Sequence, residues 1–201
     1  MTSFTELQQQ RRTIYALGQN VQQTPESLFE LVKSAVRYAP TAFNNQTVRS
    51  IVLTGDAHEK LWDIVAKRLK QEVPDETAYQ ATLAKINASF RAGFGTVLFF
   101  TDTAIVKSFE ENVPLYAENF QDWSEQGHGI AEYATWLALT EAGLGASLQH
   151  YNPLIDEEVA EAFDVPSTWR LRAQLVFGSI EAPAAKKDFV GDNERFKHYS
   201  K

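Results

Sequence analysis

Apolar residues recur at the spacing of amphipathic helices in the first third of the chain. Thr24 and Pro25 are typical of an N-cap followed by the first helical residue, and apolar side chains then recur every three or four positions. Because proline cannot continue a helix, we expect this one to end just before Pro40. A second helix should open at a capping box formed by Asp56 and Glu59.

Two further helices differ from these in composition. Ser3 and Glu6 match a capping box ahead of a short polar helix that carries Arg11 and Arg12 near its end. Residues 130–142 instead have apolar side chains on nearly every side. This pattern predicts a helix that is buried on several sides, in the core or at a subunit interface.

Four short segments rich in branched and aromatic residues are predicted strands: residues 50–54, 96–101, 146–150 and 171–178. Helical segments separate them, but the order is not a regular alternation of strand and helix. We therefore expect an α+β fold with a mixed sheet. No proline-rich or serine-rich linker divides the 201 residues, which favours a single domain over residues 1–201.

Composition narrows the classes of function. The net charge is −7 and the basic residues are scattered, which argues against a nucleic-acid partner. The chain has no cysteine, so disulfides, thiolate metal sites and cysteine nucleophiles are excluded, and its four histidines lack ligand spacing, so we expect no metal. No run is long enough to span a membrane and the start does not look like a signal peptide, so we expect a cytoplasmic protein with no membrane partner.

The stretch GLGASLQHYNP, residues 143–153, invites comparison with a dinucleotide-binding loop. That loop runs from strand into helix and needs a third glycine, whereas this one runs from helix into strand and has Leu148 at the third position. Gly143 is better explained as a left-handed residue that ends a helix. The polar run Gln149, His150, Tyr151 and Asn152 then follows a predicted strand.

Two other segments carry candidate binding chemistry. Arg11, Arg12 and Thr13 can hold a phosphate through charge-assisted hydrogen bonds, although an adjacent arginine pair is more often a solvated surface feature. The segment PTAFNNQTVR, residues 40–49, has three amide side chains that suit the edge of a flat heteroaromatic ring, and equally suit a loop with asparagine in turn geometry.

Taken in order, these segments resemble the flavin-dependent nitroreductase family. The match comprises the Arg11-Arg12-Thr13 sequence, a Pro-Thr-x-x-Asn-x-Gln loop at residues 40–46, and Gly-Leu-Gly at residues 143–145. The segments FGTVLFF, PLYAENFQDWSEQ and GLGASLQHYNP are similar to the fatty-acid repression and oxidative-stress subgroup. The chain departs from the family pattern at Tyr15, where a second basic residue is usual, and at Thr47 and Val48, where a Pro-Trp pair is usual.

The resemblance implies a three-layer fold, with a central mixed sheet flanked by helices, built as an intertwined homodimer that binds FMN at its interface. It implies that NAD(P)H reduces the FMN and that a nitroaromatic compound or quinone then takes the electrons in a ping-pong cycle, with a place in oxidative or xenobiotic stress. No catalytic side chain is implied. The residues implied to bind the cofactor are Arg11, Arg12, Thr13, Tyr15, Pro40, Thr41, Ala42, Asn44, Gln46, Gln149, His150, Tyr151, Lys186 and Lys187.

Within that set, the resemblance assigns separate parts of FMN. Arg11, Arg12 and Thr13 would take the phosphate and ribityl chain, with Lys187 or else Lys186 completing the phosphate site. Pro40, Thr41 and Ala42 would approach the ring from the partner subunit, with Asn44 and Gln46 supporting that loop, and residues 149–152 would run along the ring. Two alternatives stay open: a flavin-binding redox sensor with little turnover, and a dimeric scaffold without a cofactor.

Overall fold

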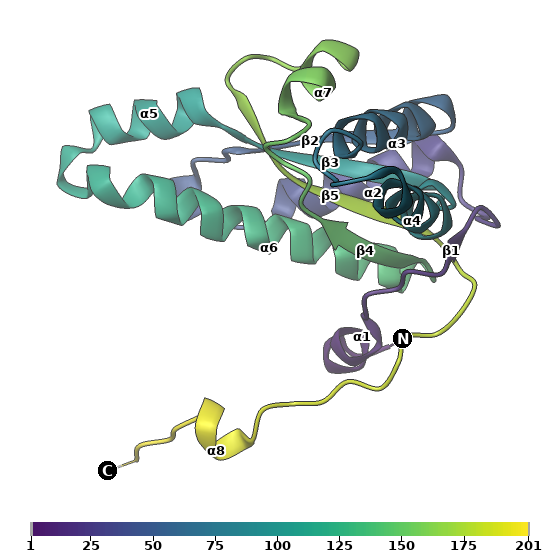
Figure 1. Ribbon diagram of the computed structural model, residues 1–201. Helices are drawn as coiled ribbons and strands as arrows, with labels where there is room; N and C mark the ends of the chain where they lie inside the picture. The colour runs from purple at the N-terminus through teal and green to yellow at the C-terminus, as the bar shows by residue number, and fades with distance from the viewer. Residues whose placement is uncertain (1, 201) are drawn as a thin grey trace.

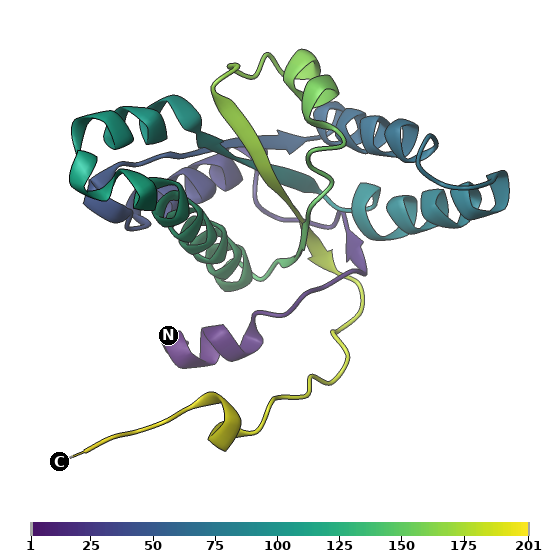
Figure 2. The same ribbon diagram turned by 60° about the vertical axis from the view of Figure 1, so that its left-hand side comes forward.

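A computed structural model describes residues 2–200 as one layered body with an extended C-terminal tail (Figures 1 and 2). Its elements in chain order are α1 (Phe4–Gln10), β1 (Leu17–Gly18), α2 (Pro25–Tyr38), η1 (Ala42–Asn44), β2 (Val48–Thr54), α3 (Asp56–Leu69), α4 (Glu76–Ile86), η2 (Asn87–Arg91), β3 (Gly95–Asp102), α5 (Thr103–Asn112), η3 (Pro114–Asn119), α6 (Phe120–Glu141), β4 (Gly145–Gln149), α7 (Asp156–Ala162), β5 (Trp169–Ile180) and α8 (Asp192–Arg195).

The sheet is built around β5, the longest strand. β5 pairs with β3 on one side and with β4 on the other, β2 lies outside β3, and β1 pairs with the end of β5. These ladders are antiparallel, and a parallel bridge between Thr13 and Ala146 makes the sheet mixed. The α+β fold with a mixed sheet is therefore confirmed.

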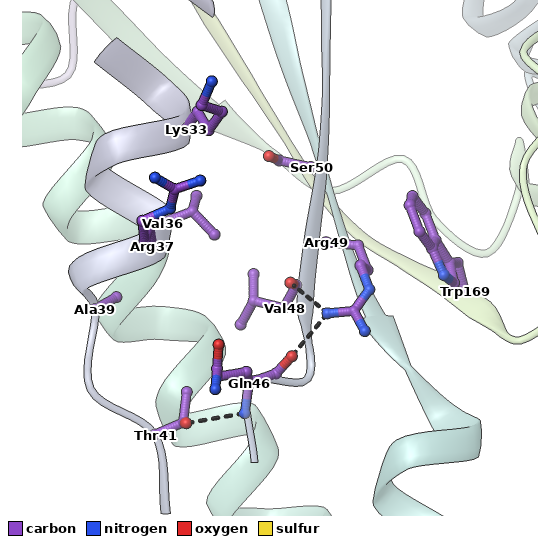
Figure 3. A pocket seen from close by; sticks show the side chains of 10 residues that line it. All are labelled: Lys33, Val36, Arg37, Ala39, Thr41, Gln46, Val48, Arg49, Ser50 and Trp169. Atoms are coloured by element: carbon purple, nitrogen blue, oxygen red, sulfur yellow. Dashed lines mark hydrogen bonds between the residues drawn. The ribbon is translucent and has the colours of Figure 1, made fainter. Parts of the chain in front are cut away.

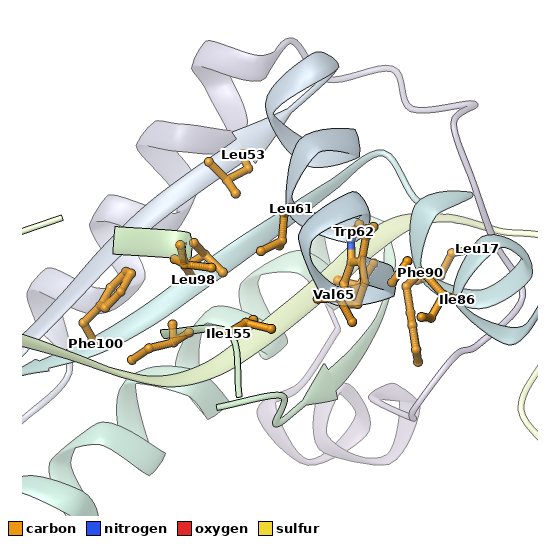
Figure 4. Packing of buried hydrophobic residues seen from close by; sticks show 14 of the residues in the cluster. Leu17, Leu53, Leu61, Trp62, Val65, Ile86, Phe90, Leu98, Phe100 and Ile155 are labelled. Atoms are coloured by element: carbon orange, nitrogen blue, oxygen red, sulfur yellow. The ribbon is translucent and has the colours of Figure 1, made fainter. Parts of the chain in front are cut away.

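Both faces of the sheet are covered, because alternate side chains of the fully buried strand β3 enter two separate cores. Val97 and Phe99 point into a core shared with α2 and α6. Leu98 and Phe100 point into the other core, which Trp62 of α3 and neighbouring residues fill (Figure 4). The expected three-layer arrangement of helices on a central sheet is thus present.

The helix predicted before Pro40 is confirmed in detail. The side chain of Thr24 accepts a hydrogen bond from the backbone N–H of Ser27, Pro25 is the first helical residue, and α2 ends at Tyr38. The capping box of Ser3 and Glu6 is also present, with both of its hydrogen bonds formed.

The capping box predicted from Asp56 and Glu59 is wrong. The N-cap position belongs to Gly55, whose φ is +55°, and no side chain caps α3. Glycine allows a left-handed turn directly from the end of β2 into α3, so Asp56 becomes the first helical residue instead of the cap. Its charge still lies in the first turn, where the helix dipole favours it.

Several boundaries also differ from prediction. The helix predicted over residues 130–142 is the second half of α6, which begins at Phe120 and has 22 residues. The last strand is longer than residues 171–178, since β5 has 12 residues, and β4 ends at Gln149 and excludes His150. No helix between residues 2 and 200 has both the length and the apolar character that crossing a membrane requires.

The tail leaves the end of β5 and runs past α1, away from the sheet (Figures 1 and 2). Its residues from Lys186 to Ser200 are all exposed, including the large apolar side chains Phe189, Val190, Phe196 and Tyr199.

Candidate functional site

The predicted cofactor-binding residues gather in three places. The first, here called the basic edge, contains Arg11, Arg12, Thr13, Tyr15, Lys186 and Lys187. The second, the strand end, contains Gln149, His150 and Tyr151. The third, the amide loop, is residues 40–46 and includes Pro40, Thr41, Ala42, Asn44 and Gln46.

The basic edge brings the start of the chain against its tail. Arg12 donates from Nη2 to the carbonyl oxygen of Ala185 at 2.5 Å. A hollow of about 490 Å³ lies between residues 12–16 and 182–187, and both Lys186 and Lys187 line it. An adjoining hollow of about 500 Å³ is lined by Arg11, Arg12 and Lys187, and by residues absent from the prediction, among them Tyr133 and Arg195.

The cations of the basic edge are free to meet an anion. Within residues 2–200, no carboxylate oxygen lies within 4 Å of a charged nitrogen of Arg11, Arg12, Lys186 or Lys187. The guanidinium of Arg11 lies 4.5 Å from the ring centroid of Trp136, which restricts its orientation. Several guanidinium and ammonium groups around an open hollow can bind a phosphate through charge-assisted hydrogen bonds.

The strand end is joined to the basic edge by backbone pairing. The N–H of Ile14 donates to the carbonyl of Ala146 at 2.9 Å, within the parallel bridge between Thr13 and Ala146. Gln149 is three residues further along β4, or roughly 10 Å, and its buried Nε2 has no hydrogen-bond partner within residues 2–200. An unpaired amide donor at the end of a strand suits a polar ligand edge.

Tyr151 is positioned by the core. Its ring packs edge-on against Trp62, at 5.8 Å and 81°, and against Phe90, at 6.2 Å and 74°. Burial raises the pKa of the Tyr151 hydroxyl, and the neighbouring hydroxyl of Tyr15 raises it further. The phenol of Tyr151 is therefore a neutral neighbour of Tyr15.

The backbone around Tyr151 is held by Gln174, a residue absent from the prediction. The N–H of Tyr151 donates to Oε1 of Gln174 at 2.8 Å, and Nε2 of Gln174 donates to Oδ1 of Asn152 at 3.3 Å. Gln174 is fully buried and interrupts an otherwise apolar part of β5, which was the available signal in the sequence. The N–H of Tyr151 is consequently occupied, whereas His150 is exposed.

The amide loop lines a separate hollow of about 440 Å³ between α2 and β2 (Figure 3). The N–H of Gln46 donates to Oγ1 of Thr41 at 3.0 Å, which closes the loop on itself. Arg49 holds the end of the loop by donating from Nη1 to the carbonyl of Gln46 at 2.7 Å, while its Nη2 pairs with Asp102 at 3.1 Å. Arg49 and the adjacent Trp169 were not anticipated from the sequence.

One chain does not bring the amide loop to the basic edge. The loop contacts α6 at Gly127, where an added Cβ would lie 3.2 Å from Cγ2 of Thr41, whereas Arg11 contacts α6 at Trp136. Nine residues of α-helix separate these two contact points by roughly 13 Å. The hollows lined by the two groups share no residue.

No metal centre is suggested by this arrangement. Within the part of the chain that the structure describes, residues 2–200, no three His, Cys, Asp or Glu side chains lie close enough together to hold an ion.

Known proteins resemble this chain over most of its length. The nitroreductase CinD from Lactococcus lactis, solved in complex with nicotinic acid, is 56% identical with a TM-score of 0.91, and the match covers 98% of this chain and 100% of that one. CinD in complex with chloramphenicol is 54% identical with a TM-score of 0.90 over the same shares.

More distant relatives extend the comparison. The nitroreductase FRM2 of Saccharomyces cerevisiae is 32% identical over 185 residues, which are 90% of each chain. The FMN-dependent nitroreductase NfnB from Mycobacterium smegmatis, solved in complex with NADPH, is 15% identical with a TM-score of 0.75, covering 98% of this chain and 97% of that one. That likeness shows a shared fold.

The family model described as the nitroreductase family matches residues 9–179, which run from the end of α1 to the end of β5. This match takes in the arginine pair, the amide loop and the strand end. The chain belongs to the nitroreductase family.

Proposed function

We propose that this protein is an FMN-dependent oxidoreductase that uses NAD(P)H to reduce nitroaromatic compounds or quinones by a ping-pong mechanism. The observation that carries the proposal is the bridge between Thr13 and Ala146, which places β4 beside the cations of the basic edge. Among residues 2–200 these cations form no ion pair, and the amide nitrogen of Gln149 at the end of β4 has no hydrogen-bond partner. The basic edge suits a phosphate, and the neighbouring strand end suits a heteroaromatic ring. Together they suit a ligand that carries a phosphate at one end and such a ring at the other.

The described residues fit FMN part by part. Arg11, Arg12 and Thr13 would hold the phosphate and ribityl chain, with Lys187 or Lys186 at the phosphate. Gln149, His150 and Tyr151 would lie along the ring, and Nε2 of Gln149 is the donor that we assign to its polar edge. The N–H of Tyr151 already donates to Gln174, so it is not available to the ring. Tyr151 would contact the ring with its side chain instead.

We infer that the site is completed in a homodimer. The amide loop lies roughly 13 Å along α6 from the basic edge, and the hollow that it lines shares no residue with the basic hollows, which supports an arrangement in which the loop serves the flavin of a second copy. A second copy would bring its Pro40, Thr41 and Ala42 to the ring, with Asn44 and Gln46 supporting the loop. The exposed apolar side chains of the tail and the partly exposed face of α6 are surfaces that such a partner could cover.

FMN, when bound, supplies the hydride acceptor and the electron donor for both half-reactions. The protein's task is then to hold and orient. The cations fix the phosphate, the buried Gln174 fixes the backbone of residues 151–152, and Trp62 and Phe90 keep water from the inner side of Tyr151. No side chain needs to act as a general acid or base.

The substrate class draws support from the relatives. CinD, at 54–56% identity, has been solved with nicotinic acid, chloramphenicol and 4-nitrophenol, the last two of which are nitroaromatic compounds. Our assignment to the fatty-acid repression and oxidative-stress subgroup is a proposal that rests on the segments FGTVLFF, PLYAENFQDWSEQ and GLGASLQHYNP. We propose a cytoplasmic role in oxidative or xenobiotic stress.

The test is direct titration of the flavin-free protein with FMN, followed by turnover. We expect FMN fluorescence to be quenched on binding, and NADH or NADPH oxidation to accelerate when 4-nitrophenol, chloramphenicol or a quinone is added. Absence of FMN binding would refute the flavin function and leave a scaffold without a cofactor. Binding without accelerated oxidation for any acceptor would favour the redox sensor.

The Arg12→Ala variant tests the phosphate site. Loss of a charge-assisted contact should weaken FMN binding by about 1.5–3 kcal/mol. Lys107→Ala is the matched control, because Lys107 is an exposed cation on α5 that does not line either basic hollow. Equal FMN affinity for both variants would place the phosphate elsewhere.

A further inference from the structure

The amide loop has an unusual backbone. Phe43, Asn44 and Gln46 have φ angles of +53°, +51° and +48°, in the left-handed region that residues other than glycine rarely adopt. Such residues carry a steric cost and persist only where their surroundings hold them in place. Because three such residues lie within four positions, we expect contacts with the rest of the protein to help the hydrogen bonds within the loop to hold it.

Part of the holding force comes from an aromatic cluster, formed by Phe43, Tyr116, Phe120 and Trp123. The ring of Phe43 lies 5.7 Å from that of Tyr116, 5.5 Å from that of Phe120 and 5.9 Å from that of Trp123, and it stacks on Trp123 at 21°. Phe43 is 55% exposed, so contact with these rings, more than burial, determines its position.

Close packing of the loop on α6 adds to this, as do the hydrogen bonds of Gln46 with Thr41 and Arg49. Thr41 contacts Gly127, where only a hydrogen atom lies between the helix and the loop. Asn45 is 4% exposed, and neither atom of its amide has a hydrogen-bond partner among residues 2–200. The loop is therefore pressed on α6 at Thr41 and anchored by a ring at Phe43.

We propose that Phe43 is a positioning residue. Through the aromatic cluster it holds the amide loop in the left-handed conformation that presents Thr41 and Ala42 to the flavin, and Gly127 sets how closely the loop approaches α6. The effect on FMN binding rests on the proposed flavin function. The holding of the loop does not, because it can be measured in the protein without FMN. The apparent affinity for a ligand falls in proportion to the fraction of the receptive conformation.

The first experiment compares Phe43→Leu with Phe43→Tyr. Leucine keeps an apolar side chain but loses the three ring contacts, and tyrosine restores the ring. Phe29→Leu is the control, since Phe29 is a similarly exposed aromatic residue on α2 outside the cluster. In flavin-free protein, we expect amide hydrogen exchange at residues 42–46 to accelerate about 5- to 10-fold in Phe43→Leu, and to stay at the wild-type rate in Phe43→Tyr and Phe29→Leu.

With FMN, the same variants should separate again. We expect the dissociation constant to rise about 5- to 10-fold in Phe43→Leu, with a change in the visible absorption bands of the bound flavin, and to return to near the wild-type value in Phe43→Tyr.

The second experiment uses two glycines on one helix. In Gly127→Ala the new methyl group meets Thr41, whereas in Gly129→Ala it meets nothing within 4 Å. Both changes add the same helix propensity. Only Gly127→Ala should therefore weaken FMN binding and accelerate exchange in the loop.

The outcomes are distinguishable. If amide hydrogen exchange at residues 42–46 stays at the wild-type rate in flavin-free Phe43→Leu and Gly127→Ala, these contacts do not hold the loop. This conclusion does not depend on the FMN affinity of the variants. Accelerated exchange with unchanged FMN affinity overturns its link to the flavin. Failure of the wild-type protein to bind FMN refutes the proposed function, and with it that link, while the exchange data still decide how the loop is held.

Discussion

At the scale of single residues, His58 shows how burial determines a protonation state. Its Nε2 lies 3.2 Å from the carbonyl of Arg91, which only accepts, so Nε2 carries the proton and donates. Its Nδ1 then accepts from the hydroxyl of Thr96 at 2.9 Å, and that hydroxyl accepts from Nε1 of Trp62 at 3.2 Å. The three side chains form a hydrogen-bond chain in which the neutral ring uses both of its nitrogens.

This chain predicts a pH dependence of stability. Burial lowers the pKa of His58 in the folded protein below its ordinary value of about 6.5. Below about pH 6.5 the unfolded chain takes up a proton that the folded protein does not, so the free energy of unfolding should fall as the pH drops toward the folded-state pKa.

The measurement is denaturant unfolding between pH 7.5 and about pH 5, for the wild type and for His58→Gln. A glutamine can accept from Thr96 and donate to Arg91 without titrating. We expect the loss of stability over this range to be smaller in the variant. Equal losses would mean that His58 is charged in the folded protein.

At the scale of elements, local signals were read correctly where one or two residues decide the structure. Thr24 and Pro25 start α2 because a cap and a fixed φ act within one turn. The capping box predicted from Asp56 was wrong because Gly55, the residue before it, takes the N-cap position. Gly55 has a left-handed φ, and that turn depends on where β2 ends. Strand ends were missed for a similar reason, since β5 extends as far as its partners β1 and β3 allow.

The contact between β1 and β5 gives a prediction at this scale. A Cβ added at Gly178 would overlap the carbonyl oxygen of Gly18, so Gly178→Ala must push β1 off the sheet. We expect a loss of about 1–3 kcal/mol in the free energy of unfolding, or more, measured by denaturant titration.

Gly129→Ala is the control for this variant. Its methyl group meets nothing within 4 Å on α6, and replacing a helical glycine should add about 0.5–1 kcal/mol. Similar stabilities for the two variants would show that β1 can shift without cost.

At the scale of the whole molecule, the sequence suggested candidate binding residues but not which of them lie together within one chain. Arg12 and Lys187 lie 175 positions apart and meet only because β5 returns the chain beside its own start. Tyr133 and Arg195 line the same hollow, but no sequence motif contains them. Residues that meet only in the folded chain leave no pattern along the sequence. The separation of the amide loop from the basic edge is likewise a property of the folded chain.

The C-terminal tail is expected to contribute to FMN binding but not to folding. Except for the partly buried Ala184, the two hydrophobic cores are built from residues 14–177, whereas residues 182–187 and Arg195 line the basic hollows. A chain ending at Glu181 should therefore keep its cooperative thermal unfolding and its far-ultraviolet circular dichroism. It should lose most of its FMN affinity, because Lys186, Lys187 and the carbonyl that orients Arg12 are gone. We also expect the tail to cover part of a second copy in the proposed homodimer. Light scattering should then report a monomer for the truncated chain. The full chain with Lys197→Ala, a single change within the tail, should stay a dimer. A truncated chain that binds FMN as tightly as the full one would show that the phosphate lies outside the basic edge.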